Sequence, residues 1–265
     1  MAKTLKDAKQ ELIYVRDKLY DSLSTAEDNG KQKGKKEGRN EVWGAIQNYG
    51  KRDVYSSAFT EGGWNKENFK PIYDMRPTAL ASAFIRTNNS PADAPQIDFI
   101  EVAEEQGIVF DFSNCTNFHM AFATGGISRL GVVDLKGGTN LTYTFYGAYN
   151  STQGLRSIEK LICYETNVFQ NTTFQGCQFL TDLNVEGVIA SSIDFSSCPL
   201  GLDSAISVIE HLVNLSSNKG SATIAISKHT ADLLDENNTQ ITTPEGYMYD
   251  WRTYITDFIY WGLSI

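Results

Sequence analysis

The sequence predicts an α+β fold: an N-terminal coiled-coil helix, then a short leucine-rich-repeat-like solenoid with a helical C-terminal cap. Three observations lead to this expectation. Leucines recur seven residues apart near the start, leucine-led apolar clusters recur 25 residues apart in the middle, and apolar residues at helical spacing dominate the C-terminal part. We therefore divide the chain into a coiled-coil helix (1–29), a linker helix with an aromatic collar (30–95), the solenoid (96–201) and the C-terminal cap (202–265).

The first segment carries a heptad pattern. Leu5, Leu12 and Leu19 are seven apart, and Ala8 and Val15 follow a leucine by three positions. This is the a/d arrangement of a coiled coil. We expect these five side chains to join copies of the chain into a homo-oligomer, with a trimer as the first guess. An amphipathic helix packed on the body is the alternative.

The linker segment changes character twice. Residues 24–40 are polar and contain glycine, Glu41–Tyr49 has the composition of a helix, and Gly50 stands in its C-terminal capping position. An irregular aromatic stretch follows, which predicts a collar packed by its own large side chains. Residues 88–95 (NNSPADAP) form the best loop signal and mark a boundary.

The middle of the chain contains a degenerate repeat of the form L-x-x-h-x-h, where h is apolar. Its leading residues are Leu130, Leu155 and Leu180, and each follows an aromatic residue. A repeat in this size range predicts stacked units, since one unit cannot bury its apolar face alone. We expect six side chains to be buried, each against its counterpart one turn away: Phe122, Phe145, Phe174, Leu130, Leu155 and Leu180.

The C-terminal part predicts elements that cover the last open turn. Apolar spacing favours helices at Leu202–Leu215, Lys228–Asp235 and Tyr249–Ile259, and alternation favours a strand at Ser221–Ser227.

Two motifs resemble known proteins. Phe174–Val185 (FQGCQFLTDLNV) and Asp194–Pro199 are similar to the BspA-type leucine-rich repeats of bacterial surface proteins. The run from Trp43 to Asp74 resembles an N-terminal module encoded by gut bacteria and their phages, where it precedes such repeats and sits among tail genes. The resemblance implies a surface-exposed or virion-attached protein and supplies no catalytic residue.

Charge and hydropathy exclude several classes of function. The net charge is −9, and the basic surplus is confined to residues 1–40, with ten Lys/Arg against seven Asp/Glu. An acidic body argues against a nucleic-acid partner. No run is long enough for a membrane span, and the N-terminus has no secretory-signal pattern. We expect a protein made in the host cytoplasm and carried in the virion; a bacterial cytoplasmic or cell-surface location is the alternative.

The residues that usually carry chemistry are scattered. The four cysteines form no C-x-x-C pair, none of the three histidines has a metal-ligand partner at a suitable spacing, and no nucleophile or phosphate-binding motif occurs. The sequence predicts no enzyme, no catalytic residue, no cofactor and no metal. A glycan depolymerase using Asp111 and Asp194 is a remote alternative, although both aspartates suit hydrogen-bonded turns better.

These observations predict a structural protein of a phage tail tip or baseplate that contacts other tail proteins and binds a host-surface glycan or protein. A bacterial repeat protein outside any virion is the alternative. The candidate receptor loop lies between Gly147 and Gly154. It makes the second unit longer than the other two between its aromatic residue and its leading leucine. The binding residues of this loop would be Tyr149, Asn150, Ser151 and Gln153. A surface insertion without a role is the competing interpretation.

Overall fold

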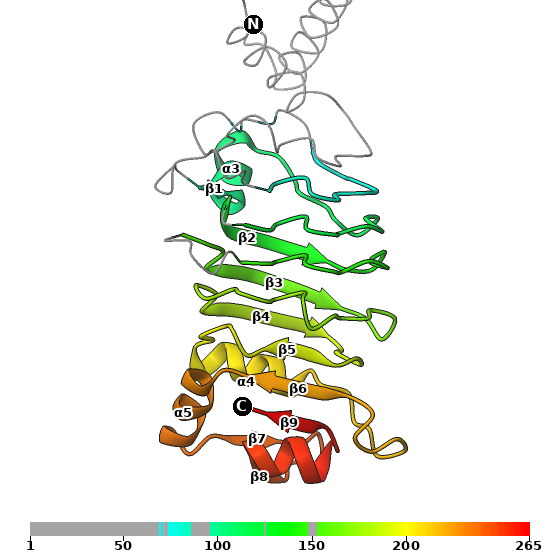
Figure 1. The fold of residues 1–265 in the computed structure, drawn as a ribbon, viewed down its shortest axis with the longest axis vertical. Coiled ribbons are helices and arrows are strands. Elements are labelled where there is room, and N and C mark those ends of the chain that lie inside the picture. Colours follow the sequence, from blue (N-terminus) through cyan, green and yellow to red (C-terminus); the bar gives the residue numbers. More distant parts are fainter. Residues whose placement is uncertain (1–68, 70, 72–73, 86–95, 125, 148–152) are drawn as a thin grey trace, which may run out of the picture.

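Parallel strands stacked along the long axis of the molecule form the frame of the fold (Figure 1). The structure, a computed structural model, describes residues 69, 71, 74–85, 96–124, 126–147 and 153–265. The elements are β1 (Ile97–Asp98), α3 (Phe99–Gln106), β2 (Ile127–Asp134), β3 (Ser157–Cys163), β4 (Asp182–Gly187), β5 (Ile193–Phe195), α4 (Leu202–Glu210), β6 (Thr223–Ile226), α5 (Lys228–Glu236), β7 (Gln240–Thr242), β8 (Met248–Asp250), α6 (Trp251–Thr253), the π-helix η1 (Tyr254–Phe258) and β9 (Gly262–Ser264).

The strands form three sheets. One has the order β1-β2-β3-β4 and a second the order β5-β6-β9, all pairs parallel; β7 and β8 form an antiparallel hairpin. In Figure 1, α3 and β1 lie at the upper end of the stack, and α6 lies with the hairpin at the lower end. In β4 the two faces of the strand alternate, with Leu183 and Val185 buried while their neighbours are exposed.

The predicted fold class is wrong. The described residues form an α/β fold with parallel sheets and the helices α3, α4, α5 and α6, not an α+β leucine-rich-repeat-like solenoid. A repeat of fixed length would place equivalent residues at one spacing, but Leu130 pairs with Ile158, 28 residues on, and Ile158 pairs with Leu183, 25 residues on. The predicted helical cap is also wrong, because β6 pairs with β5 and is followed by β7, β8 and β9.

The leucine register was therefore misplaced at its first unit. Leu130 lies in β2 opposite Ile158, so it is not the counterpart of Leu155, which precedes β3. All three leading leucines are nevertheless buried, with Leu155 and Leu180 at 6% and 0% exposed. The predicted coiled-coil helix and its residues Leu5, Ala8, Leu12, Val15 and Leu19 lie outside the described residues.

The aromatic anchors do stack as expected. The ring centroids of Phe122 and Phe145 are 5.7 Å apart, and those of Phe145 and Phe174 are 4.8 Å apart, both pairs near parallel. Phe84 extends the column at one end and Phe195 at the other, at 6.1 and 4.6 Å. Each such pair is worth about 0.5–1.5 kcal/mol beyond the burial of its area. This column, defined here as the phenylalanine column, is the centre of the core.

Local signals explain most helix ends. Asp98 caps α3 by accepting hydrogen bonds from the backbone N–H groups of Ile100 and Glu101, and Gly107 ends that helix in the left-handed region at φ 60°. Ser227 caps α5 through Thr230 N–H. Among the described helices, none has the length and apolarity that crossing a membrane would require.

Candidate binding surface

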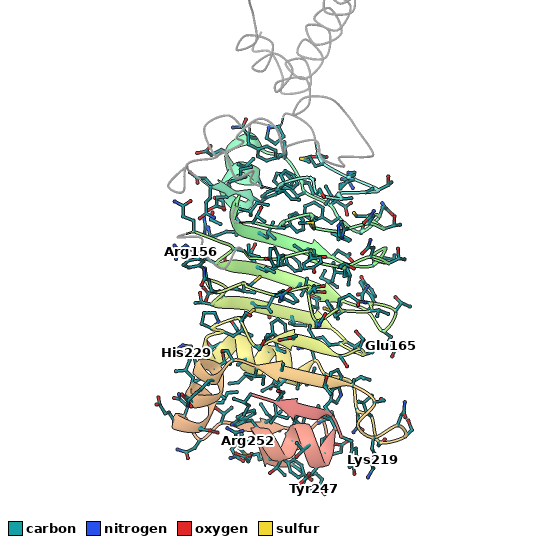
Figure 2. The ribbon with its side chains drawn as sticks, in the orientation of Figure 1. Arg156, Glu165, Lys219, His229, Tyr247 and Arg252 are labelled. Atoms are coloured by element: carbon teal, nitrogen blue, oxygen red, sulfur yellow. The ribbon has the colours of Figure 1, made fainter. Side chains whose placement is uncertain are left out.

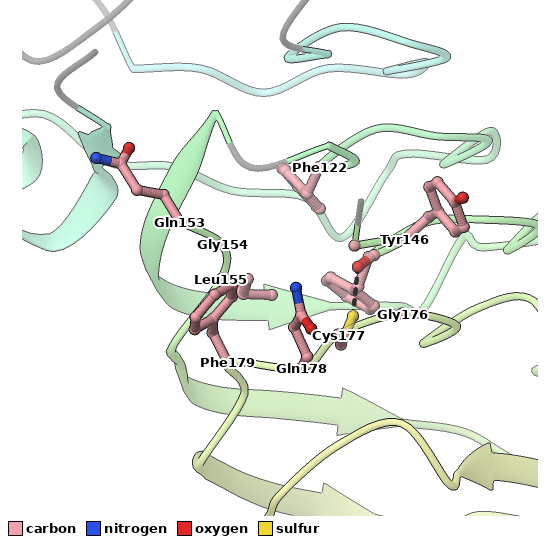
Figure 3. A pocket seen from close by; sticks show the side chains of 11 residues that line it. Phe122, Tyr146, Gln153, Gly154, Leu155, Gly176, Cys177, Gln178 and Phe179 are labelled. Atoms are coloured by element: carbon pink, nitrogen blue, oxygen red, sulfur yellow. Dashed lines mark hydrogen bonds between the residues drawn. The ribbon is translucent and has the colours of Figure 1, made fainter. Parts of the chain in front are cut away.

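Of the four predicted binding residues of the receptor loop, the structure describes only Gln153. Tyr149, Asn150 and Ser151 fall within residues 148–152, outside the described part of the chain. Gln153 is described and half-buried, and it lies at the rim of a shallow hollow (Figure 3). The residues around this hollow are Phe122, Phe145, Tyr146, Gly147, Gln153, Gly154, Leu155, Gly176, Cys177, Gln178 and Phe179.

The hollow is too small for a small-molecule site. Its free volume is about 10 Å³, about enough for one water molecule, whereas ligand pockets usually enclose about 300–1,000 Å³. Phe122, Phe145 and Leu155 are buried members of the core. The Cys177 thiol donates a hydrogen bond to the Phe145 carbonyl, 2.5 Å away, so it is already engaged (Figure 3).

A second ladder of backbone hydrogen bonds runs along the stack and carries a motif that the sequence analysis missed. The pattern T-x-[LF]-x-x-[AT]-F occurs at 78–84 (TALASAF), 116–122 (TNFHMAF) and 139–145 (TNLTYTF). The second copy connects the other two: Leu80 N–H donates to the Asn117 carbonyl, and Phe118 N–H donates to the Asn140 carbonyl, both at 2.9 Å. The last residue of each copy, a phenylalanine, joins the phenylalanine column.

The fifth position of the motif has an unusual backbone. Ser82, Met120 and Tyr143 have φ values of 56°, 52° and 56°, in the left-handed region that costs a residue other than glycine about 1–2 kcal/mol. Asn117 and Asn140 steady two of these turns, because each side-chain oxygen accepts a hydrogen bond from the backbone N–H two residues on.

This turn places aromatic side chains along one edge of the stack. The rings of His119 and Tyr143, from successive copies of the motif, are 6.3 Å apart, and those of Tyr143 and Tyr146 are 5.3 Å apart, both edge to face. All three side chains are partly exposed. We call His119, Tyr143 and Tyr146 the edge patch. Because the backbone beneath is hydrogen-bonded on both sides, the edge patch is a preformed aromatic surface.

The candidate nucleophiles are poorly suited to chemistry. Burial raises the pKa of the Cys115 and Cys163 thiols to about 12 each, and burial together with Cys177 raises that of Cys198. Thiolate, the reactive form, is therefore scarce at neutral pH. Within the described ranges, no three His, Cys, Asp or Glu side chains come together as a metal site would require.

Asp111 and Asp194 have structural partners. Each carboxylate accepts a hydrogen bond from a backbone N–H two residues on, Ser113 at 3.1 Å and Ser196 at 2.8 Å. Hydrogen bonding from the Ser113 side chain lowers the pKa of Asp111 despite partial burial, and Arg76 contributes in the same direction. Both aspartates thus close turns in the way the sequence suggested.

No family model, curated protein or solved structure matches the chain.

Proposed function

We propose that this chain is a non-enzymatic structural protein of a phage tail tip or baseplate and that it binds host-surface glycan through the edge patch. The observation that carries the binding role is the row of partly exposed aromatic rings from two successive copies of the turn motif, held on a hydrogen-bonded backbone. The resemblance of the run from Trp43 to Asp74 to a module found among phage tail genes supports the virion setting.

The chemistry of the edge patch suits a sugar chain. An aromatic face contacts the apolar C–H face of a sugar ring, and tyrosine hydroxyls exchange hydrogen bonds with sugar hydroxyls. Rigid aromatic side chains lose little conformational entropy on binding, so they serve well as anchors. Because His119 and Tyr143 belong to consecutive turns, the surface follows the long axis and fits an extended polymer better than a single sugar.

Binding at one such patch would be weak, and an assembly of several copies of the chain would raise the overall affinity for the cell surface. Linking weak sites multiplies the overall affinity without any new contact. A homo-oligomer, with a trimer as our guess, would supply that multivalency, and other tail proteins would anchor it. The proposal requires no cofactor.

The experiment uses the purified full-length chain and cells of its host. The test variant is Tyr143→Asn with Tyr146→Ala, since asparagine tolerates the left-handed region better than most residues. Tyr260→Asn is the matched control, because Tyr260 is also a partly exposed tyrosine with positive φ, at 62°, but lies near the C-terminus. We expect cell binding to fall at least tenfold, about 1.4 kcal/mol, in the test variant alone.

Equal binding by the parent and the test variant would exclude the edge patch, once circular dichroism has shown that the variant is folded. Incubation with purified host polysaccharide, followed by size analysis, tests the depolymerase alternative; shortening of the polymer would contradict a non-enzymatic role.

A further inference from the structure

A second surface stands apart from the edge patch, at the end of the stack where the β7–β8 hairpin lies (Figures 1 and 2). Tyr247 and Met248 are 65% and 66% exposed, the highest values among the large apolar side chains of the described residues. Hydrogen bonds fix the hairpin turn that carries these residues. Thr243 N–H donates to the Tyr247 carbonyl at 2.8 Å, and Tyr247 N–H donates to the Thr243 hydroxyl at 3.2 Å.

More aromatic side chains lie beside this hairpin. The Tyr249 ring stacks on Phe258 with centroids 5.1 Å apart, and Phe258 contacts Tyr254 at 5.4 Å. Tyr254 and Phe258 belong to η1, and π-helical turns of this kind are frequent at functional sites. We call Tyr247, Met248, Tyr249 and Phe258 the end patch. It combines aromatic anchors with an adaptable methionine, the composition of protein-interaction surfaces.

The surroundings of the end patch are acidic. Glu245 lies two residues before Tyr247 in the sequence. Burial raises the pKa of Tyr254, and the charges of Glu210 and Glu245 raise it further. Asp250 and Asp257 lie on β8 and η1. Of the basic groups at this end, Lys228 is held by Asp232 and Arg252 by Asp235, each at 2.7 Å, and Lys219 lies over the Tyr260 ring. Within the described residues, Glu245 and Asp257 have no ion-pair partner, and the Asp250 carboxylate caps α6 by accepting from the backbone N–H groups of Arg252 and Thr253.

We propose that the end patch docks a basic, apolar segment of a partner protein. An apolar centre supplies binding energy as it leaves water, while a carboxylate rim attracts Lys or Arg and repels acidic surfaces. The same end of the molecule already shows the expected contacts, with the Arg252 guanidinium 4.2 Å from the Trp251 ring centroid and the Lys219 ammonium 3.7 Å from that of Tyr260. A second copy of the patch is disfavoured, since two acidic rims would face each other.

The test titrates the full-length chain with two short synthetic peptides, one alternating arginine and leucine and one alternating glutamate and leucine. The variant Tyr247→Ser with Met248→Ser removes the apolar centre. Because both side chains are exposed, the substitutions should leave folding stability nearly unchanged. Val168→Ser is the matched control, because Val168 is an apolar residue, 58% exposed, that is distant in sequence from the end patch. Fluorescence anisotropy measures the affinities, and light scattering measures the oligomeric state.

We expect the arginine peptide to bind the parent and the Val168→Ser control equally, and the double variant at least tenfold more weakly. The glutamate peptide should not bind. The double variant is the decisive arm, because a net charge of −9 could attract a basic peptide to any surface. Unchanged affinity in the double variant, equal binding of both peptides, no binding of either, or self-association that the double substitution abolishes would each overturn the proposal.

Discussion

Replacing Phe174 with alanine should remove one ring from inside the phenylalanine column. The Phe174 ring is 0% exposed and lies between Phe145, 4.8 Å away at 17°, and Phe195, 4.6 Å away at 39°. Truncation of a buried phenylalanine costs about 3–5 kcal/mol. Two ring contacts at about 0.5–1.5 kcal/mol each are lost with it, so the cost should fall in the upper half of that range.

Urea unfolding of the full-length chain, followed by circular dichroism, measures this cost. With a slope of about 2 kcal/mol per molar urea, a loss of about 4 kcal/mol moves the midpoint by about 2 M. Phe179→Ala is the control, since Phe179 is only partly buried and has the Arg156 guanidinium 5.6 Å from its ring; it should cost less than half as much. A Phe174→Ala cost below about 1 kcal/mol would refute a core built on this column.

Three further outcomes follow from the structure. Hydrogen bonds from Arg252 and then Trp251 lower the pKa of Asp235 in the folded state, so it stabilises the fold above the unfolded-state pKa and loses that contribution as pH falls. Asp235→Asn should therefore flatten the loss of stability below about pH 4, measured by thermal unfolding at each pH. All four cysteines are buried and free, so a thiol reagent at pH 8 should label them only after urea is added. Rapid labelling of the native protein would contradict their burial. Gly147→Ala should lower the stability of the fold strongly, because the added Cβ would lie 2.0 Å from the Gly176 carbonyl oxygen. Gly201→Ala is the control, since its Cβ would meet its nearest atom at 3.4 Å. Equal melting temperatures of the two variants would contradict the close packing at Gly147.

The sequence identified the core residues better than their register. A phenylalanine that precedes an apolar cluster is buried in almost any stacked arrangement, so Phe122, Phe145 and Phe174 were predictable. The strand register was not. In the first unit, apolar residues three apart, Leu130 and Val133, fit a partner starting at Leu155 as well as one starting at Ile158. Backbone hydrogen bonds between turns make that choice, and they leave no mark in the apolar pattern.

In the C-terminal part, too, strand pairing could not be predicted from the apolar pattern. Helices were expected at Leu202–Leu215 and Lys228–Asp235. α4 and α5 lie there because apolar spacing is a local signal, and Ser227 also caps α5; α4 has no side-chain cap and ends at Glu210. The single helix expected at Tyr249–Ile259 is instead the end of β8 followed by α6 and η1. Pairing of β8 with β7 depends on a turn and a partner strand, which helical spacing within one segment does not report.

Of the two candidate surfaces, one could have been found from the sequence and the other could not. The edge patch could have been found from sequence, because T-x-[LF]-x-x-[AT]-F recurs with its phenylalanine at the end of each copy. Its spacing of 38 and then 23 residues hid it from a search for a constant period. The end patch could not have been found, since Tyr247 and Met248 are ordinary core residues by composition, and only the hairpin turn exposes them.

The proposed role as a tail protein can be tested by mass spectrometry of purified virions. Particles purified from a lysate of the strain that carries the gene should contain the chain in a fixed ratio to the other tail proteins, and washing in high salt should leave that ratio unchanged. Finding the chain in the cells or their envelope but not in the particles would contradict the proposed tail-protein role and favour a bacterial interaction protein.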